Sequence, residues 1–262
     1  MRLLFLGDVV GRPGRRALAA LVPRLAAQED IEFVIANCEN ASGGKGVDPR
    51  SADELHEAGA DVLTSGNHVW QNREIVPYMR ESGRLLRPLN FPPGVPGVGW
   101  TVQKARRSEA RVAVLNLIGR VFMAPVDCPF RAADEALADI RREASIVFVD
   151  MHAEATSEKV AMGRFLDGRV SAVVGSHTHI QTADETVLPG GSAYLTDAGM
   201  CGPEDSVLGV RTDRVVERFL TQMPTRFEVA AGAVLVQGAV IDIDGETGRA
   251  RSIRRVRERV VV

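Results

Sequence analysis

The stretch Val170-Ser-Ala-Val-Val-Gly-Ser-His-Thr-His179 decides the fold. Its first half is apolar and rich in β-branched residues, which is typical of a strand buried on both faces. Its second half, from Gly175 to His179, is small and polar and holds two histidines two residues apart. In α/β proteins, ligands bind at the carboxyl ends of parallel strands. The stretch therefore predicts a buried strand of an α/β fold that ends in functional side chains.

Similar apolar runs recur along the chain and alternate with amphipathic segments. The runs predict strands at Leu3–Leu6, Phe33–Ala36, Asp61–Leu63, Val112–Leu117 and Ile146–Val149. The amphipathic segments predict helices at Arg15–Ala27, Pro49–Ala58, Arg131–Arg142 and Lys159–Leu166. This alternation predicts an α/β fold with a largely parallel core covered by helices.

The pattern after Asp184 becomes rich in strands. Short strands are expected at Thr186–Leu188 and Ala193–Thr196, and a terminal hairpin at Ala230–Asp244 and Arg249–Val262, joined by a turn at Asp244-Gly245. Proline and glycine make Asn90–Gly99 a predicted loop. The chain has no internal repeat and no linker, so one domain over residues 1–262 is expected.

The composition excludes several classes of protein. Hydrophobic residues make up 45% of the 262 residues and charged residues 25%, an ordinary globular balance. Because 32 basic residues face 34 acidic ones, stable nucleic-acid binding is not expected. No apolar run reaches the roughly 18 residues of a membrane span, and the N-terminal run is too short for an export signal. The three cysteines show no CxxC pair, so we expect a cytoplasmic protein without membrane association.

Polar side chains follow the ends of five predicted strands. In parallel sheets these ends share one edge, so the side chains are expected to converge although they are far apart in sequence. The candidates are Asp8, Glu39, Asn40, Asn67, His68, His152, His177 and His179.

This set has the chemistry of a metal centre with two ions. It offers more ligands than one four-coordinate zinc ion uses, and mixed oxygen and nitrogen donors suit manganese or iron. One carboxylate can bridge two ions about 3.5–4 Å apart, and Glu39 is the candidate bridge. On an extended segment, His177 and His179 would point to opposite sides, which would suit one histidine per ion if the loop keeps part of that geometry.

Each motif alone also has an ordinary structural explanation. An aspartate after a strand is often a turn or cap residue, and an Asn-His pair can form a turn. Five such clusters in one chain favour a site over chance, and the His-x-His pair is the most specific. The loop Ala41–Gly46 does not have the spacing of a P-loop, because Gly46 follows Lys45 where serine or threonine is required.

These motifs resemble those of the calcineurin-like metallophosphoesterase superfamily. The resemblance rests on Gly7-Asp8, Gly66-Asn67-His68 and Gly175–His179. Three positions depart from the usual pattern: Val10 replaces a histidine, Glu39-Asn40 replaces an aspartate, and Val69 replaces an acid. Together with Asn37–Gly46 and Thr196–Gly202, these departures are similar to the YmdB-like branch of the superfamily.

The resemblance implies a four-layer αββα sandwich with two metal ions per chain. Asp8, Glu39, Asn40 and His179 would hold the first ion, and Glu39, Asn67, His152 and His177 the second. His68 would be the general acid. Because Asn40 stands in for the missing histidine and makes the site rich in oxygen, iron or manganese is expected rather than zinc.

The implied activity is hydrolysis of small cyclic nucleotides. The expected reaction converts 2′,3′-cyclic nucleoside monophosphates to 3′-nucleotides. A hydroxide held between the metals would attack phosphorus, and His68 would protonate the leaving oxygen. Two alternatives remain open: a broad phosphomonoesterase or nucleotidase using the same site, and a regulatory metal-binding protein with little turnover. Related proteins also suggest a homo-oligomer.

Overall fold

A computed structural model describes residues 1–261, so Val262, the last residue of the predicted hairpin and domain, lies outside the described residues. The helices are α1 (Gly11–Gln28), α2 (Pro49–Glu57), α3 (Ile75–Glu81), α4 (Pro129–Glu143), α5 (Thr156–Leu166) and α6 (Thr212–Thr221). The strands are β1 (Arg2–Leu6), β2 (Asp8–Val9), β3 (Ile31–Asn37), β4 (Val62–Thr64), β5 (Trp100–Lys104), β6 (Arg111–Ile118), β7 (Ile146–His152), β8 (Ala172–Ser176), β9 (Thr186–Val187), β10 (Ala193–Leu195), β11 (Met200–Pro203), β12 (Val234–Ile243) and β13 (Ala250–Val260).

The strands form two sheets. The first has the order β2-β11-β12-β1-β3-β4, with β13 paired to β12, and the second has the order β5-β6-β7-β8-β10-β9. The run β1-β3-β4 is parallel, as is the run β6-β7-β8-β10. The terminal hairpin β12-β13 is antiparallel, as its sequence pattern predicts. The parallel core is therefore divided between two sheets that each carry antiparallel strands.

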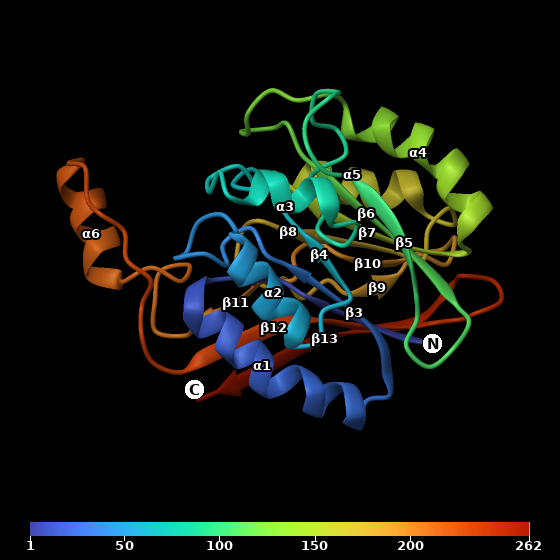
Figure 1. Ribbon diagram of the computed structural model, residues 1–262, viewed down its shortest axis with the longest axis horizontal. Coiled ribbons are helices and arrows are strands. Elements are labelled where there is room, and N and C mark those ends of the chain that lie inside the picture. Colours follow the sequence, from blue (N-terminus) through green and yellow to red (C-terminus); the bar gives the residue numbers. More distant parts are fainter. Residues whose placement is uncertain (262) are drawn as a thin grey trace.

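Alternating side chains on each strand create three hydrophobic layers. In β1, Leu4 and Leu6 pack with α1, whereas Leu3 and Phe5 face the second sheet. The ring of Phe5 lies 4.9 Å from that of Phe148 in β7, measured between centroids. On the other face of β7, Val147 packs with α4 and α5. Helices thus cover the outer face of each sheet (Figure 1), which confirms the four-layer αββα sandwich.

The helix signals in the sequence correspond to real local interactions. Asp48 precedes α2, and its carboxylate accepts a hydrogen bond from the backbone N–H of Ser51 at 2.7 Å. Pro49 occupies the first turn, where a missing N–H costs nothing. The helix α1 begins at Gly11, four residues before the predicted start at Arg15.

The sequence pattern did not predict β2, β5, β11, α3 or α6. The strand β2 has two residues, too few for a periodic signal, and β5 directly follows the loop rich in proline and glycine. The helix α6 is amphipathic but stands away from the body of the molecule (Figure 1). Among the helices of residues 1–261, none combines the length and apolarity that a bilayer crossing requires.

Candidate metal centre

Both sheets contribute to one cluster of side chains at the ends of their strands. Asp8 lies in β2, Glu39 and Asn40 follow β3, and Asn67 and His68 follow β4, all in the first sheet. From the second sheet come His152, the last residue of β7, and His177 and His179, which follow β8. The structure therefore brings the eight candidates together, although they come from two sheets and not from one shared edge.

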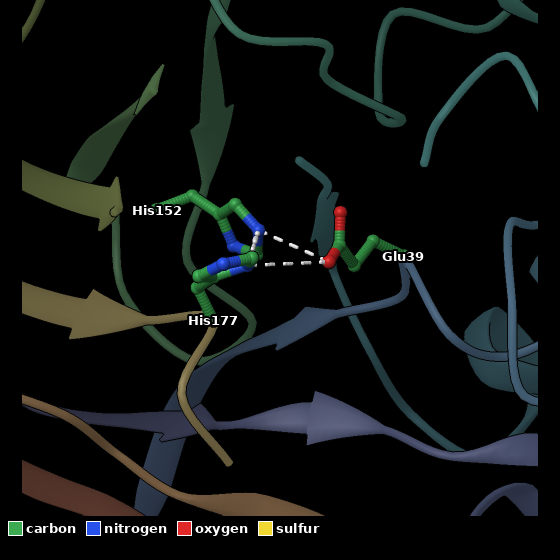
Figure 2. A group of neighbouring side chains, drawn as sticks. All are labelled: Glu39, His152 and His177. Atoms are coloured by element: carbon green, nitrogen blue, oxygen red, sulfur yellow. Dashed lines mark hydrogen bonds and ion pairs between the residues drawn. The ribbon is translucent and has the colours of Figure 1, made fainter. Parts of the chain in front are cut away.

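Glu39, His152 and His177 form the centre of this cluster. Figure 2 shows their side chains pointing toward one another from separate segments. Oε1 of Glu39 lies 3.0 Å from Nε2 of His152, which in turn lies 3.0 Å from Nδ1 of His177. One ligand atom from each residue falls within 4.8 Å of the other two. Oδ1 of Asn67 joins this group, 3.2 Å from Nε2 of His152.

Asp8, Asn40 and His179 form a second group beside the first. Nε2 of His179 lies 3.3 Å from Oδ1 of Asn40 and 3.9 Å from Oδ1 of Asp8. Asp8 also connects the two groups, because its Oδ2 accepts a hydrogen bond from the backbone N–H of His177 at 3.0 Å. The candidates thus form two groups, with one histidine of the His-x-His pair in each.

The His-x-His segment does not keep an extended geometry. His177 has φ of 99° and His179 has φ of 64°, both in the left-handed region that residues other than glycine rarely adopt. The two imidazoles still reach different groups, but the sharp turn of the backbone separates them, not the alternation of a strand. Such backbone conformations persist where the surrounding structure holds them in place.

A buried polar network orients His152. The hydroxyl of Ser176 donates to Oδ1 of Asp150 at 2.6 Å, so its oxygen is free to accept from Nδ1 of His152, 2.9 Å away. This arrangement turns Nε2 toward Glu39. Asp150 also accepts from Thr64 at 2.5 Å and from Asn37 at 3.0 Å, two residues of the first sheet. Burial raises the pKa of Asp150 to about 6, although these hydrogen bonds oppose the effect.

The residues that support the cluster were not among the candidates from the sequence. Asp150 and Ser176 stand within two residues of candidates in the chain, but short polar residues at strand ends are too common to be singled out. Two further contacts were also missed: the carboxylate of Glu154 lies 3.1 Å from Nε2 of His177, and the carbonyl of Leu208 lies 3.1 Å from Nδ1 of His179. No pattern in the sequence points to Glu154 or Leu208. Only the folded chain shows that each lies beside a histidine of the cluster.

Charges in the cluster are strongly coupled. Burial alone would raise the pKa of Glu39, but the charge and hydrogen bond of His152 hold it well below its usual range. Burial alone would lower the pKa of His152, but Glu39, Asp8 and Asp150 raise it to about 9. Buried carboxylates thus create a negative potential that favours a cation.

The residues of the cluster fit divalent metal ions. Oδ1 of Asp8 is buried and has no hydrogen-bond partner among the described residues, an arrangement that a buried carboxylate oxygen rarely tolerates. The set combines carboxylate, amide and imidazole donors, which are the ligands of manganese, iron and zinc. The side chains of Asp8 and Glu39 are also almost completely removed from solvent.

His68 lies at the edge of the cluster. Its backbone N–H donates to Oε2 of Glu39 at 3.1 Å, and its half-buried ring lies beside the side chain of Asn67. Burial holds the pKa of His68 below its ordinary value, with the charge of Glu39 opposing this effect. A histidine that is anchored through its backbone keeps its ring free for another contact.

The fold and the cluster define an enzyme of the metallophosphoesterase class, a phosphoric ester hydrolase. A solved structure titled as a novel phosphatase from Mycoplasma pneumoniae superimposes with a TM-score of 0.92 at 32% identity, covering 99% of this chain and 93% of that one. A protein from Thermus thermophilus, titled hypothetical, gives the same TM-score at 42% identity, with 99% of both chains covered.

The chain belongs to the family described as YmdB-like protein, whose model matches residues 4–256. A relative from Bacillus subtilis (strain 168), named 2′,3′-cyclic-nucleotide 2′-phosphodiesterase, is 48% identical over 98% of this chain and 96% of its own length. Both findings confirm the resemblance seen in the motifs.

We predict that the substitution Glu39→Gln lowers the metal content of the purified protein. The substitution keeps the shape of the side chain but removes the negative charge at the centre of the cluster, so fewer cations should be retained. Elemental analysis of wild-type and variant protein measures the ratio of metal to chain. Two ions per chain are expected for the wild type and at most one for the variant.

Glu109→Gln is the matched control, because Glu109 is an exposed glutamate paired with Lys104. It should leave the metal content unchanged. Equal metal content in wild type and Glu39→Gln would contradict the assignment of Glu39 to the metal centre.

Proposed function

We propose that this protein hydrolyses 2′,3′-cyclic nucleoside monophosphates to 3′-nucleotides with the help of two metal ions. The observation that carries the proposal is the pair of adjoining donor groups, joined by Asp8, at the ends of both sheets. The name of the Bacillus subtilis relative supports the choice of substrate.

In this proposal, Asp8, Glu39, Asn40 and His179 hold one ion, and Glu39, Asn67, His152 and His177 hold the other. When bound, such ions supply a water nucleophile at neutral pH and neutralise charge on the phosphoryl oxygens. Iron or manganese is proposed rather than zinc because Asn40 in place of a histidine makes the donor set rich in oxygen. Glu39 is the proposed bridge between the ions, and its Oε1 faces Nε2 of His152 in one of the two groups.

The chain's own contribution to bond cleavage is a proton. Opening the ring toward the 3′-nucleotide breaks the bond between phosphorus and the 2′ oxygen, and the 2′ alkoxide must gain a proton as it leaves. His68 is the proposed donor, because its ring is half exposed and its backbone is fixed by Glu39. General acid catalysis of this kind contributes about 10²- to 10⁴-fold.

The test of the substrate uses protein loaded with manganese or iron. We expect 2′,3′-cyclic AMP to be converted to 3′-AMP, and 3′,5′-cyclic AMP to react much more slowly, with products identified by chromatography. Faster release of phosphate from 3′-AMP than ring opening would favour the phosphomonoesterase alternative. No turnover of any of these compounds by a protein with two bound ions would contradict the proposed activity and favour the regulatory alternative.

The substitution His68→Ala tests the general acid. We expect a loss of about 10²- to 10⁴-fold in kcat on 2′,3′-cyclic AMP, whose alkoxide leaving group needs a proton. A nitrophenyl phosphodiester should lose much less, because nitrophenolate leaves without one. Steady-state kinetics on both substrates measures the difference.

His56→Ala is the matched control, since His56 is a partly buried histidine on α2 that contacts the carbonyl of Ala60. It should leave both rates unchanged. Equal losses on the two substrates for His68→Ala, or loss of metal from that variant, would exclude the role of proton donor.

A homo-oligomer is the proposed assembly, and α6 offers a surface for it. Val216, Phe219 and Leu220 recur at the spacing of one face of α6, Met223 lies just beyond its C-terminal end, and Phe219 and Leu220 are 74% and 80% exposed. Monomeric proteins rarely leave contiguous apolar surface of this kind open, and its charged neighbours already pair within the chain, as Arg214 does with Glu217. A second copy of the same face is the partner that an apolar, charge-balanced helix fits best.

Light scattering after gel filtration tests this assembly. The wild type should have the mass of two or more chains, and the double substitution Phe219→Ser and Leu220→Ser should reduce it toward one chain, because the buried apolar area is lost. Phe122→Ser, at a 90% exposed position elsewhere, is the control and should keep the wild-type mass. A monomeric wild type, or an unchanged mass in the double variant, would contradict α6 as the interface.

Other expectations from the sequence stay predictions, among them the cytoplasmic location and the single domain. The expectation that the protein does not bind nucleic acid also stays a prediction. In β13, Arg254 pairs with Glu29, Arg255 with Glu185 and Arg259 with Glu204, all carboxylates of other segments. Paired arginines are less available to a phosphate backbone.

A further inference from the structure

A buried ion pair lies behind the proposed metal centre. Nζ of Lys159, in α5, is 2.6 Å from Oδ2 of Asp197, which follows β10. Both side chains are about 1% exposed. Burying two opposite charges is often no more stabilising than burying an apolar pair, so stability alone explains this arrangement poorly.

The carboxylate of Asp197 also holds two loops. Its Oδ2 accepts from the backbone N–H of Thr178 at 3.2 Å and from the hydroxyl of Thr178 at 2.8 Å. Its Oδ1 accepts from the backbone N–H of Gly199 at 2.8 Å. Lys159 balances the charge of the carboxylate, and Oδ2 accepts from its ammonium group as well as from Thr178.

Thr178 is the residue between His177 and His179. Both histidines have positive φ, a conformation that needs support from outside the loop. The two hydrogen bonds from Thr178 to Asp197 provide that support midway between the two imidazoles.

Gly199 connects Asp197 to the other sheet. Its carbonyl accepts from the backbone N–H of Asp8 at 3.1 Å. A Cβ atom on Gly7 would lie 1.9 Å from this same carbonyl oxygen, so Gly7 has no room for a side chain there. The backbone around Asp8 is therefore positioned against a residue that Asp197 holds.

We propose that Asp197 is a positioning residue for the metal centre, an inference that rests on the metal-dependent function proposed above. Through Thr178 it fixes His177 and His179, and through Gly199 it fixes the backbone of Asp8. Donors from both sheets are thereby placed before a metal binds. Loss of a supporting interaction of this kind lowers metal affinity about 10- to 100-fold.

The experiment is a titration of metal-free protein with manganese chloride, followed by electron paramagnetic resonance, which measures free and bound manganese without reference to turnover. Asp197→Asn should bind manganese about 10- to 100-fold more weakly than the wild type. Asp167→Asn is the matched control, because Asp167 accepts backbone hydrogen bonds from Gly190 and Ser192 in a turn outside the cluster. It should bind manganese as the wild type does.

A second pair of variants applies if Asp197→Asn does not fold. Thr178→Val keeps the shape of the side chain but loses its hydrogen bond to Asp197, whereas Thr178→Ser keeps the hydroxyl. Thr178→Val should bind manganese about threefold to tenfold more weakly than Thr178→Ser. Circular dichroism confirms that the compared proteins are folded.

The outcomes distinguish this inference from the proposed function. Wild-type affinity in Asp197→Asn, the same loss in Asp167→Asn, or equal affinities in the two Thr178 variants would overturn the positioning role while leaving the activity untouched. A wild type that binds manganese but hydrolyses no cyclic nucleotide would overturn the proposed substrate and leave the positioning role in place.

Discussion

The rest of the site depends on the hydrogen bonds that the carboxylate of Asp150 accepts. It is buried in β7 of the second sheet, yet it accepts hydrogen bonds from Asn37 and Thr64 of the first. A buried carboxylate is costly unless its oxygens are satisfied, so the strand ends of the two sheets must stay close enough to supply these donors. The same carboxylate orders Ser176, and through it the ring of His152. The carboxylate of Asp150 therefore both holds the two sheets together and orients the ring of His152.

Glycine makes this close approach possible at one further point. A Cβ atom on Gly66 would lie 2.2 Å from the ring of His152 and 2.3 Å from Oε2 of Glu39. Only a residue without a side chain leaves that volume to the cluster. The glycine of the Gly-Asn-His motif therefore has a physical reason. It leaves room for the ring of His152, from the other sheet, beside Asn67.

Two kinds of support surround the candidate ligands. His152 is aimed by side chains that lie between the sheets, whereas His177 and His179 are held by a loop whose unusual backbone is anchored on Asp197. In both cases the supporting group is a buried carboxylate that contacts no candidate donor atom directly. Because the supporting carboxylates stay outside the cluster, the candidate oxygen and nitrogen donors face one another. Oδ1 of Asp8 has no hydrogen-bond partner among the described residues.

The sequence alone determined the parallel runs β1-β3-β4 and β6-β7-β8-β10 as strands and α1, α2, α4 and α5 as helices, because apolar periodicity and capping are local properties. It also determined the candidate residues, since polar groups at the ends of buried strands stand out in the chain. The sequence could not determine that the parallel strands divide between two sheets, because pairing between β1 and β12 or between β7 and β8 depends on contacts across long separations. The four-layer arrangement was available only through resemblance to a known family.

Only the tertiary structure decided how the candidates are grouped and what holds them. The left-handed backbone of His177 and His179 is imposed by contacts with distant segments, and no local pattern encodes it. Asp150 and Asp197 are ordinary acidic residues in the sequence. They become important because folding removes them from water and places donors from other segments within hydrogen-bond distance. The hydrogen bonds that they accept are strong only in the low dielectric of the assembled core.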